Sequence, residues 1–363
     1  MRIAIMAPLV TPIREPQLGG SQAVVADLSW GLTERGHEVD VYAAAGSSIP
    51  GVRVVDTGID AGSLQDVLYR PDRPWLATGH ASETAFRTIV AAIGRRTYDV
   101  VHNHAFDPPA VRSAASLSSP VIHTLHLPPD SAMATALADA SRSRNPPTVA
   151  TVSESSAAAW RHLTRIDLVL RNGVPIDRIP WSADGGDPLL FAGRFSAEKG
   201  AADAIDIARR AETEIELYGE PYDRGYMEAE IEPHGSEPGV RIRRGVPRHE
   251  LWIAMARAAA VLCPVKWEEP YGMVAAEAQA AGTPVIAYRR GALSEVIQDR
   301  KTGLLVPPDD VIAAAQAVAR AKAISRSDCR KHAEVHLNLN TTLLAHERLY
   351  KRVQDRAGLR RHG

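Results

Sequence analysis

The sequence predicts an α/β protein with two doubly wound parallel-sheet domains, one in each half of the chain. Short apolar runs suited to buried strands alternate with segments in which apolar residues recur at helical spacing. Many of these runs end in loops that contain glycine or proline, which interrupt a strand. The polar, glycine-rich stretch 182–187 has the composition of a linker between two such domains.

In the first half, the apolar run 2–7 is expected to be the first buried strand. A proline-containing loop then leads to Gly19 and Gly20, and Ser21 is a suitable N-cap for a helix over 21–35. Further strands are expected at 38–42, 99–104, 120–126 and 148–152.

The second half repeats this alternation and ends in an amphipathic helix expected over 341–354. Its centre is a loop at 266–272 followed by a helix over 273–281, where strong helix formers dominate. Gly282 ends that helix, and Pro284 prevents its continuation. Strands are expected at 188–192, 214–218, 240–243, 261–263, 285–287 and 303–307.

Composition and charge exclude several functional classes. The 42 basic and 43 acidic residues nearly cancel, so the chain lacks the charge expected of a nucleic-acid binder. No stretch reaches the ~18 uninterrupted apolar residues of a membrane-spanning helix, and the first residues are too strand-like for a signal peptide. Cys263 and Cys329 are far apart and not in metal-ligand spacing, so we expect free thiols and a cytoplasmic protein.

Two glutamates with seven residues between them lie around the start of the central helix. A helix N-terminus suits a phosphate, which would place the phosphate next to Tyr271, Gly272 and Met273. Glu269 before the helix and Glu277 inside it could then bind hydroxyl groups on either side, as the sugar and ribose of a nucleotide sugar require. The alternative interpretation is a surface loop with two solvated acids.

A basic motif at 193–200, Gly-Arg-Phe-Ser-Ala-Glu-Lys-Gly, follows the first strand of the second half. Arg194 offers a bidentate fork for phosphate oxygens, and Lys199 offers a point charge on the other side of the turn. We therefore predict that this motif binds a diphosphate. The alternative is a solvated basic turn in which a cation pairs with Glu198.

Other candidate residues lie in the first half of the chain. Gly19 and Gly20 precede a helix and would let a phosphate or a sugar approach the backbone, although their spacing is not that of a dinucleotide fingerprint. His104 and His126 follow predicted strands, at the edge where doubly wound sheets bind ligands. For either histidine the alternative is a structural role.

These motifs, in this order, resemble the GT-B retaining glycosyltransferases of the family-4 type. In that family the first glutamate of the pair contacts the donor sugar and the second contacts the ribose, which implies these roles for Glu269 and Glu277. The resemblance also implies that His126 lies beside the reacting centre, and we take His126 and Glu269 as the catalytic candidates. His104 and Asn172 are expected on the acceptor side, with Asn172 in a segment where proline replaces the family's usual acid.

The resemblance further implies two Rossmann-like domains facing an interdomain cleft. These would be an acceptor-side domain at 1–178, a nucleotide-sugar-binding domain at 179–340, and a helix at 341–363 that crosses back. The expected reaction moves a sugar from a UDP- or dTDP-sugar to a hydroxyl acceptor, with retention of configuration and with no cofactor or metal. No Asp-x-Asp motif exists, so Arg194, Lys199 and the helix dipole would stabilise the leaving diphosphate.

Two other functions remain open at this point. A nucleotide-sugar 2-epimerase of the same fold would use the same donor, and a non-catalytic protein could bind a nucleotide sugar without transferring it. The acceptor, in glycan or natural-product biosynthesis, could be a sugar, a natural product or a lipid-linked molecule. The basic tail at 351–361 is expected to be a solvated end, with membrane-surface contact as the alternative.

Overall fold

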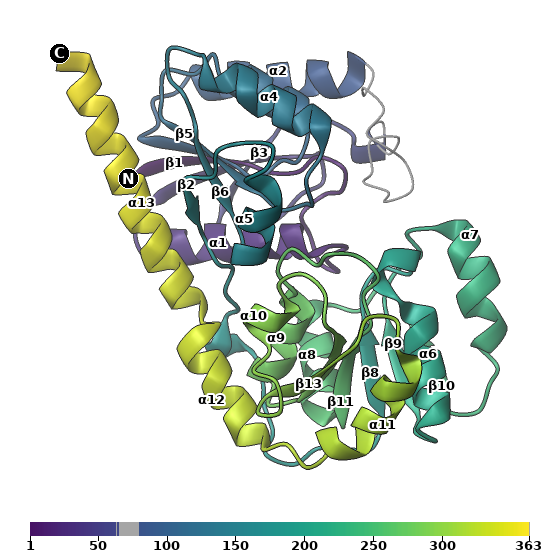
Figure 1. Ribbon diagram of the computed structural model, residues 1–363. Coiled ribbons are helices and arrows are strands. Elements are labelled where there is room, and N and C mark those ends of the chain that lie inside the picture. Colours follow the sequence, from purple (N-terminus) through teal and green to yellow (C-terminus); the bar gives the residue numbers. More distant parts are fainter. Residues whose placement is uncertain (63, 65–79, 363) are drawn as a thin grey trace. The chain divides into compact units, whose positions relative to one another are not determined.

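The computed structural model describes residues 1–62, 64 and 80–362 (Figure 1). Contacts divide the chain into two units. The first unit contains Met1–Arg14, Ser21–Arg171 and Asn340–Gly363, and the second contains Glu15–Gly20 and Asn172–Leu339. Each unit is built on one parallel sheet with helices, which confirms the predicted α/β class.

The sheet of the first unit has the strand order β3-β2-β1-β4-β5-β6-β7, and all neighbouring strands are parallel. The strands are β1 (Arg2–Met6), β2 (Glu38–Ala43), β3 (Arg53–Asp56), β4 (Val100–Asn103), β5 (Val121–Leu125), β6 (Thr148–Thr151) and β7 (Leu168–Val169). The strands β2 and β3 are added on one side of β1, and the strands from β4 onward are added on its other side. The loops after β1 and β4 therefore lie at the switch point, where sheets of this kind bind ligands.

The described helices of the first unit pack on its sheet. They are α1 (Gly20–Glu34), α2 (His80–Gly94), α3 (Pro108–Ala114), α4 (Ser131–Ser141), α5 (Glu154–Trp160) and nearly all of α13 (Leu339–His362). A core cluster joins α2 and α3 to one face, where Phe86 and Ala110 pack with Val101 of β4. Successive strand residues point to opposite faces, so His102 points away from this cluster and bonds to Tyr350 of α13 at 2.7 Å.

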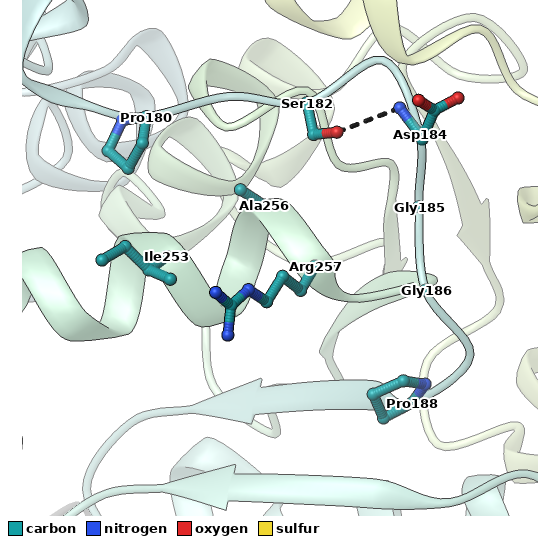
Figure 2. Close-up of a pocket in the computed structure, with 9 residues that line it drawn as sticks. All are labelled: Pro180, Ser182, Asp184, Gly185, Gly186, Pro188, Ile253, Ala256 and Arg257. Atoms are coloured by element: carbon teal, nitrogen blue, oxygen red, sulfur yellow. Dashed lines mark hydrogen bonds between the residues drawn. The ribbon is translucent and has the colours of Figure 1, made fainter.

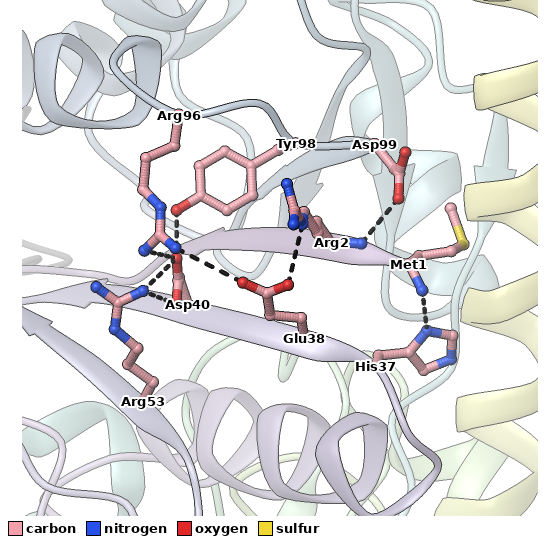
Figure 3. Close-up of polar contacts among 9 residues, drawn as sticks. All are labelled: Met1, Arg2, His37, Glu38, Asp40, Arg53, Arg96, Tyr98 and Asp99. Carbon is pink, nitrogen blue, oxygen red and sulfur yellow. Dashed lines mark hydrogen bonds and ion pairs between the residues drawn. The ribbon is translucent and has the colours of Figure 1, made fainter.

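A buried carboxylate on β2 is fully paired, as Figure 3 shows. Asp40 is 1% exposed and accepts from Arg53 at 2.9 Å, from Arg96 at 2.7 Å and from the hydroxyl of Tyr98. Burying a carboxylate is costly unless hydrogen bonds and opposite charge compensate for the lost water. These three partners therefore allow Asp40 to remain inside the unit and join β2 to β3 and to the chain after α2.

The sheet of the second unit has the order β10-β9-β8-β11-β12-β13, again with parallel neighbours. The strands are β8 (Leu189–Ala192), β9 (Ile215–Tyr218), β10 (Val240–Arg243), β11 (Ala260–Cys263), β12 (Val285–Tyr288) and β13 (Gly303–Val306). Its first strand, β8, lies between β9 and β11. The switch point of this sheet therefore lies between the loops that follow β8 and β11.

The described helices of the second unit connect these strands. They are α6 (Ala201–Arg210), α7 (Arg224–Tyr226), α8 (Arg248–Arg257), α9 (Met273–Ala280), α10 (Leu293–Val296), α11 (Val311–Ala321) and α12 (Arg326–His336). A core cluster joins α6 and α11 to the sheet, with Ile205 and Ala317 packed against Leu262 and Ile286. The α9 helix packs against α12.

Residues 172–178 belong to the second unit because they bond to the end of the α12 segment. The Val174 amide donates to Leu337 at 2.8 Å, and the Leu339 amide donates to Val174 at 3.0 Å. The last helix, yellow in Figure 1, is longer than the predicted 341–354 at both ends. Side chains of the expected basic tail from residue 359 onward lie outside those described.

Two further predictions concern the environment of the protein. None of the helices in the described part of the chain combines the length and the hydropathy that a membrane crossing requires. Cys263 and Cys329 are both free thiols, and both are buried.

Candidate active site

The switch point of the second sheet brings the predicted donor-binding motifs to one edge. β8 and β11 are adjacent, with Leu190 opposite Val261. The loop after β8 holds the basic motif at 193–200, and the loop after β11 leads into α9. Arg194, Lys199 and Glu269 are therefore carried by neighbouring loops at the carboxyl ends of two adjacent strands.

The close approach of these two loops depends on Gly200. Its φ is 75°, in the left-handed region, and a Cβ there would lie 2.0 Å from the carbonyl oxygen of Pro264. No other residue fits this position without moving the backbone. Gly200 thus holds the basic motif against the loop that carries the first glutamate.

Lys199, Trp267 and Glu269 form a compact cluster across the two loops. The Lys199 Nζ donates to Glu269 Oε2 at 2.7 Å, and Trp267 Nε1 donates to the same oxygen at 2.8 Å. The Lys199 Nζ also lies 4.4 Å from the centre of the Trp267 ring. Within the described residues, nothing donates to Glu269 Oε1, so one carboxylate oxygen is fixed and the other is available to a ligand hydroxyl.

The other cation of the motif is held in a different way. Arg194 Nη2 donates to Glu198 Oε1 at 3.0 Å, and the guanidinium lies 4.1 Å from the centre of the Tyr222 ring. The pairing with Glu198 is the one expected for a solvated basic turn, but Glu198 is buried. Ser196 lies between Arg194 and Glu198 in the chain, and its buried Oγ has no hydrogen-bond partner among the described residues. This hydroxyl is therefore suited to donate to an anionic oxygen of a ligand.

The start of α9 is open to an anion. Gly272, with φ of 97°, occupies the N-cap position and has no side chain with which to cap the first turn. A Cβ on Gly20 would lie 3.6 Å from Met273 Cγ, so Gly20 lies next to the N-terminus of α9. Gly19, which precedes Gly20 in the chain, is partly exposed. The backbone N–H groups of a first turn attract a phosphate when nothing else caps them.

Tyr271 and Asn172, predicted on the donor and acceptor sides, contact each other in the second unit. The Tyr271 hydroxyl donates to the carbonyl oxygen of Asn172, and both residues are buried. The contact ties the segment before α9 to residues 172–178. The Tyr271 hydroxyl is therefore engaged by the protein itself.

Glu277 is paired with an arginine that sequence analysis did not single out. Arg248, the first residue of α8, donates to Glu277 Oε1 from Nη2 at 2.6 Å and from Nε at 3.1 Å. Nothing in the described part of the chain donates to Glu277 Oε2. The two predicted glutamates thus share one arrangement, in which a cation holds one oxygen and the other remains available.

The switch point of the first sheet carries histidines instead of ion pairs. His104 and His126 follow β4 and β5, and His104 Nδ1 lies 2.9 Å from His126 Nε2. The His102 ring is 4.0 Å from that of His104, and His346 of α13 lies 5.5 Å from His102. The structure therefore brings the two predicted histidines into direct contact within a larger buried cluster.

These imidazoles are neutral at physiological pH. Burial lowers the pKa of His126 and of His346 to about 4, and it lowers the pKa of His102 and His104 well below 6.5. A neutral imidazole donates or accepts a hydrogen bond but offers no positive charge to a phosphate. Among the described residues, no group of three or more His, Cys, Asp or Glu side chains is arranged to hold a metal ion.

A hollow in the second unit lies away from these motifs. Figure 2 shows it between the linker from Pro180 to Pro188 and the end of α8 at Ile253 and Arg257. Pro188 directly precedes β8, so this hollow is at the amino end of that strand. Ligands of doubly wound sheets bind at the opposite, carboxyl end, so we do not assign this hollow to the site.

Sequence reasoning missed three residues that contact or adjoin the predicted ones. Trp267 and Ser196 lie inside motifs that were recognised, but their neighbours become visible only in the folded chain. Arg248 could have been noticed from the sequence, because a cation in the first turn of a helix interacts unfavourably with the helix dipole and is expected to have an anionic partner. In the structure that partner is Glu277.

Comparisons with known proteins agree with this architecture. Residues 177–335 match the family described as glycosyl transferases group 1, and residues 18–178 match Glycosyltransferase Family 4. A D-inositol 3-phosphate glycosyltransferase from Frankia alni is 30% identical, over 83% of this chain and 86% of its own.

Solved structures share the fold across nearly the whole chain. Sucrose-phosphate synthase from Thermosynechococcus elongatus aligns with a TM-score of 0.79 and 19% identity, covering 97% of this chain and 98% of that one. Anabaena HepE in complex with UDP-glucose aligns with a TM-score of 0.72 and 19% identity, covering 97% of this chain and 100% of that one.

Two parallel-sheet units, the basic motif and the paired glutamates together define a glycosyltransferase with the GT-B fold. The chain belongs to the glycosyl transferases group 1 family.

Proposed function

We propose that this glycosyltransferase moves a sugar from a UDP- or dTDP-sugar to a hydroxyl acceptor, with retention of configuration and without a metal ion. The observation that carries the proposal is the set of charges at the switch point of the second sheet. There a cationic loop adjoins Glu269, while Glu277 lies in the helix that follows, and each glutamate has one available oxygen. The UDP-glucose bound by the Anabaena neighbour supports a uridine donor.

Each part of such a donor has a suitable group in this unit. Arg194, Lys199 and the uncapped start of α9 would hold the diphosphate, because its oxygens take charge-assisted hydrogen bonds and helix N–H groups. Glu269 Oε1 would accept from hydroxyls of the transferred sugar. Glu277 Oε2 would accept from the ribose hydroxyls.

The transfer step would need no protein nucleophile. A bond forms between the acceptor oxygen and the anomeric carbon, while the bond from that carbon to the diphosphate oxygen breaks. The departing diphosphate takes the acceptor's proton, so attack occurs on the face that the leaving group vacates and configuration is retained. The cations stabilise the charge that develops on the diphosphate. We propose that His126 lies beside the reacting centre and takes part in this step.

Thermal-shift measurements with UDP, dTDP, GDP and ADP test the donor class. A ligand that binds only the folded protein stabilises it by RT ln(1 + [L]/Kd), about 2.7 kcal/mol at a hundred times Kd. We expect UDP or dTDP to give the largest shift, and we expect Lys199→Ala to reduce it. A larger increase in Tm with GDP or ADP than with UDP or dTDP would contradict the proposed uracil or thymine base of the donor.

Product analysis tests the remaining two statements. With UDP-glucose as donor, NMR of the product is expected to show the anomeric configuration of the donor. Activity is expected to survive EDTA, because cationic side chains take the place of a metal at the diphosphate. Inverted product, or activity lost in EDTA and restored by Mg²⁺ or Mn²⁺, would contradict the corresponding statement.

A further inference from the structure

Asp107 is a buried carboxylate that the proposed chemistry has not used. It lies in the loop after β4, at the switch point of the first sheet, and is 2% exposed. Its Oδ2 has no hydrogen-bond partner among the described residues, and no described lysine or arginine pairs with it. A buried carboxylate oxygen without a partner has lost its hydration with no hydrogen bond to compensate, so its position requires an explanation.

The burial of the Asp107 side chain is not explained by capping of α3. Asp107 occupies the N-cap position, where an aspartate normally accepts from the backbone N–H groups of the first turn. The next two residues are Pro108 and Pro109, which have no N–H, and the amide of Ala110 donates to the Asp107 backbone carbonyl at 2.9 Å. The side chain makes no capping bond, so it is free to bind something else.

A second buried carboxylate in the same unit shows the contrast. Asp40 is as deeply buried, and it has two arginines and a tyrosine hydroxyl around it (Figure 3). The fold therefore pairs one buried aspartate completely and leaves Oδ2 of the other without a hydrogen-bond partner among the described residues. The incompletely paired aspartate, Asp107, is the one at the ligand-binding edge of the sheet.

Two other polar atoms of this region also lack partners. His104 Nε2, three residues earlier in the same loop, is buried without a hydrogen bond, as is the Ser82 Oγ of α2. Burial raises the pKa of Asp107 to about 7, and Ser82 is near enough to oppose that shift, although the two make no hydrogen bond of normal geometry. The loop after β4 thus offers acceptors and donors but no fixed positive charge.

We propose that Asp107 binds an uncharged hydroxyl group of the acceptor, with His104 Nε2 as a second contact, and thereby selects polyol-like over phosphorylated groups at this position. A hydroxyl can donate to the carboxylate and still accept from a neighbour, which satisfies both atoms. A phosphate would meet a carboxylate and neutral imidazoles, and no cation among the described residues pairs with Asp107 to compensate. The inference rests on the proposed transferase function, because it assigns the acceptor of that reaction.

The test uses two pairs of probes and three variants. The probes are myo-inositol and glucose, each compared with its monophosphate. Asp107→Asn keeps the shape but weakens the acceptor, and Asp107→Ala removes it. Asp310→Ala is the matched control, because Asp310 is an N-cap aspartate whose side chain does accept from a backbone amide, that of Ala313 at 2.8 Å.

We expect a neutral polyol to raise the Tm of the wild-type protein and to accept glucose from UDP-glucose. Both Asp107 variants should raise the KM for that polyol by about tenfold or more, as loss of a hydrogen bond to a charged group would, with UDP affinity unchanged. Asp107→Asn should fold with a Tm at least equal to wild type, since it removes a buried unpaired charge. Asp310→Ala should lower Tm and leave the polyol KM unchanged.

Three outcomes would overturn the inference. Unchanged polyol KM in both Asp107 variants would mean that a structural water alone satisfies the carboxylate. Binding and transfer only with the phosphorylated probes would mean that the acceptor group is charged, and no response to either neutral polyol would remove the hydroxyl assignment. Polyol stabilisation that depends on Asp107 while UDP has no effect would support the inference and contradict the proposed donor instead.

Discussion

The two sheets share one strand order around their switch points but carry different side chains there. In the second unit the loops after β8 and β11 hold ion pairs, Lys199 with Glu269 and Arg194 with Glu198. In the first unit the loops after β4 and β5 hold His104 and His126, which are neutral, and Asp107, whose Oδ2 has no hydrogen-bond partner among the described residues. The same backbone topology therefore carries cations paired with carboxylates in one unit, and neutral imidazoles with one carboxyl group but no cation partner among the described residues in the other.

This difference shows that ligand class is set by loop side chains and not by the sheet. A surface with lysine and arginine suits a diphosphate. A surface with neutral imidazoles and a single carboxylate suits hydroxyl groups. Four measurements would break or sharpen this division between the units.

Mild acid is expected to destabilise the first unit more than the second. Burial lowers the pKa of His123 to about 3 and those of His126 and His346 to about 4, whereas each titrates near 6.5 in an unfolded chain. The unfolded chain then binds more protons, so this stability is complete above about pH 6.5 and is lost as pH falls toward 4. The loss is about 1.4 kcal/mol per histidine for each pH unit. Burial raises the pKa of Asp107 to about 7, so this group has the opposite effect and offsets the loss from one of the histidines.

Hydrogen exchange measures this effect separately in each unit. Peptides from β4 and β5 should lose protection between about pH 7 and 5, after correction for the intrinsic rate, while peptides from β8 and β11 in the same sample should lose less. The second unit has a smaller response because its His332 is only partly buried. Equal losses in both sheets would contradict the contrast.

Removing either cation of the basic motif should weaken diphosphate binding. Arg194→Ala or Lys199→Ala should cost roughly 1.5–3 kcal/mol in UDP affinity, the range for hydrogen bonds to charged groups. Uridine, which lacks the diphosphate, should bind both variants as it binds the wild-type protein. Calorimetry that finds UDP affinity unchanged in both variants would remove this assignment.

The two glutamates should fail in different ways when each is replaced. Glu277→Ala should weaken free UDP as well as UDP-glucose, by about 1–3 kcal/mol, because the ribose is present in both. Glu269→Ala should leave UDP affinity nearly intact and reduce turnover, because its contact requires a sugar. The same two ligands are measured on both variants, so a folding defect would weaken everything, and the reverse pattern would exchange the two roles.

His126→Ala tests whether the histidine cluster takes part in the reaction. We expect kcat to fall about tenfold or more, equivalent to about 1.4 kcal/mol, with UDP affinity close to wild type. The Tm of the variant must be measured alongside, because His126 is buried against His104. Unchanged turnover would make His126 a structural residue and His104 the better candidate.

Local sequence patterns predict the strands and helices of the chain well. Apolar runs between glycines and prolines locate β8, β11 and β12 to within about a residue, because such strands are buried on both faces and need no partner-specific pattern. The motifs at 193–200 and 269–277 also combine local chemistry with local geometry. Sequence reasoning therefore assigned Lys199 and Glu269 to the same nucleotide-sugar donor, and the structure places them on neighbouring loops of one sheet.

What the sequence does not reveal is which distant side chains meet. Arg248 pairs with Glu277 across 29 positions, and His102 bonds to Tyr350 across 248. In the sequence Asp107 has the pattern of an ordinary helix cap, and only the folded chain shows that its Oδ2 is buried without a partner among the described residues. Such facts depend on tertiary packing, which neither periodicity nor propensity encodes.

The last helix has a consequence for how the protein is made. Its residues from 340 onward complete the first unit, where Leu343 packs so closely against α1 that a Cβ on Gly31 would lie 2.6 Å from it. A ribosome delivers the strands of the first unit before the second unit, but the helix that completes the first unit only after it. Domains commonly fold in the order of their synthesis, yet here the first unit must wait until the residues after 340 have emerged, when nearly all of the second unit is already outside the ribosome.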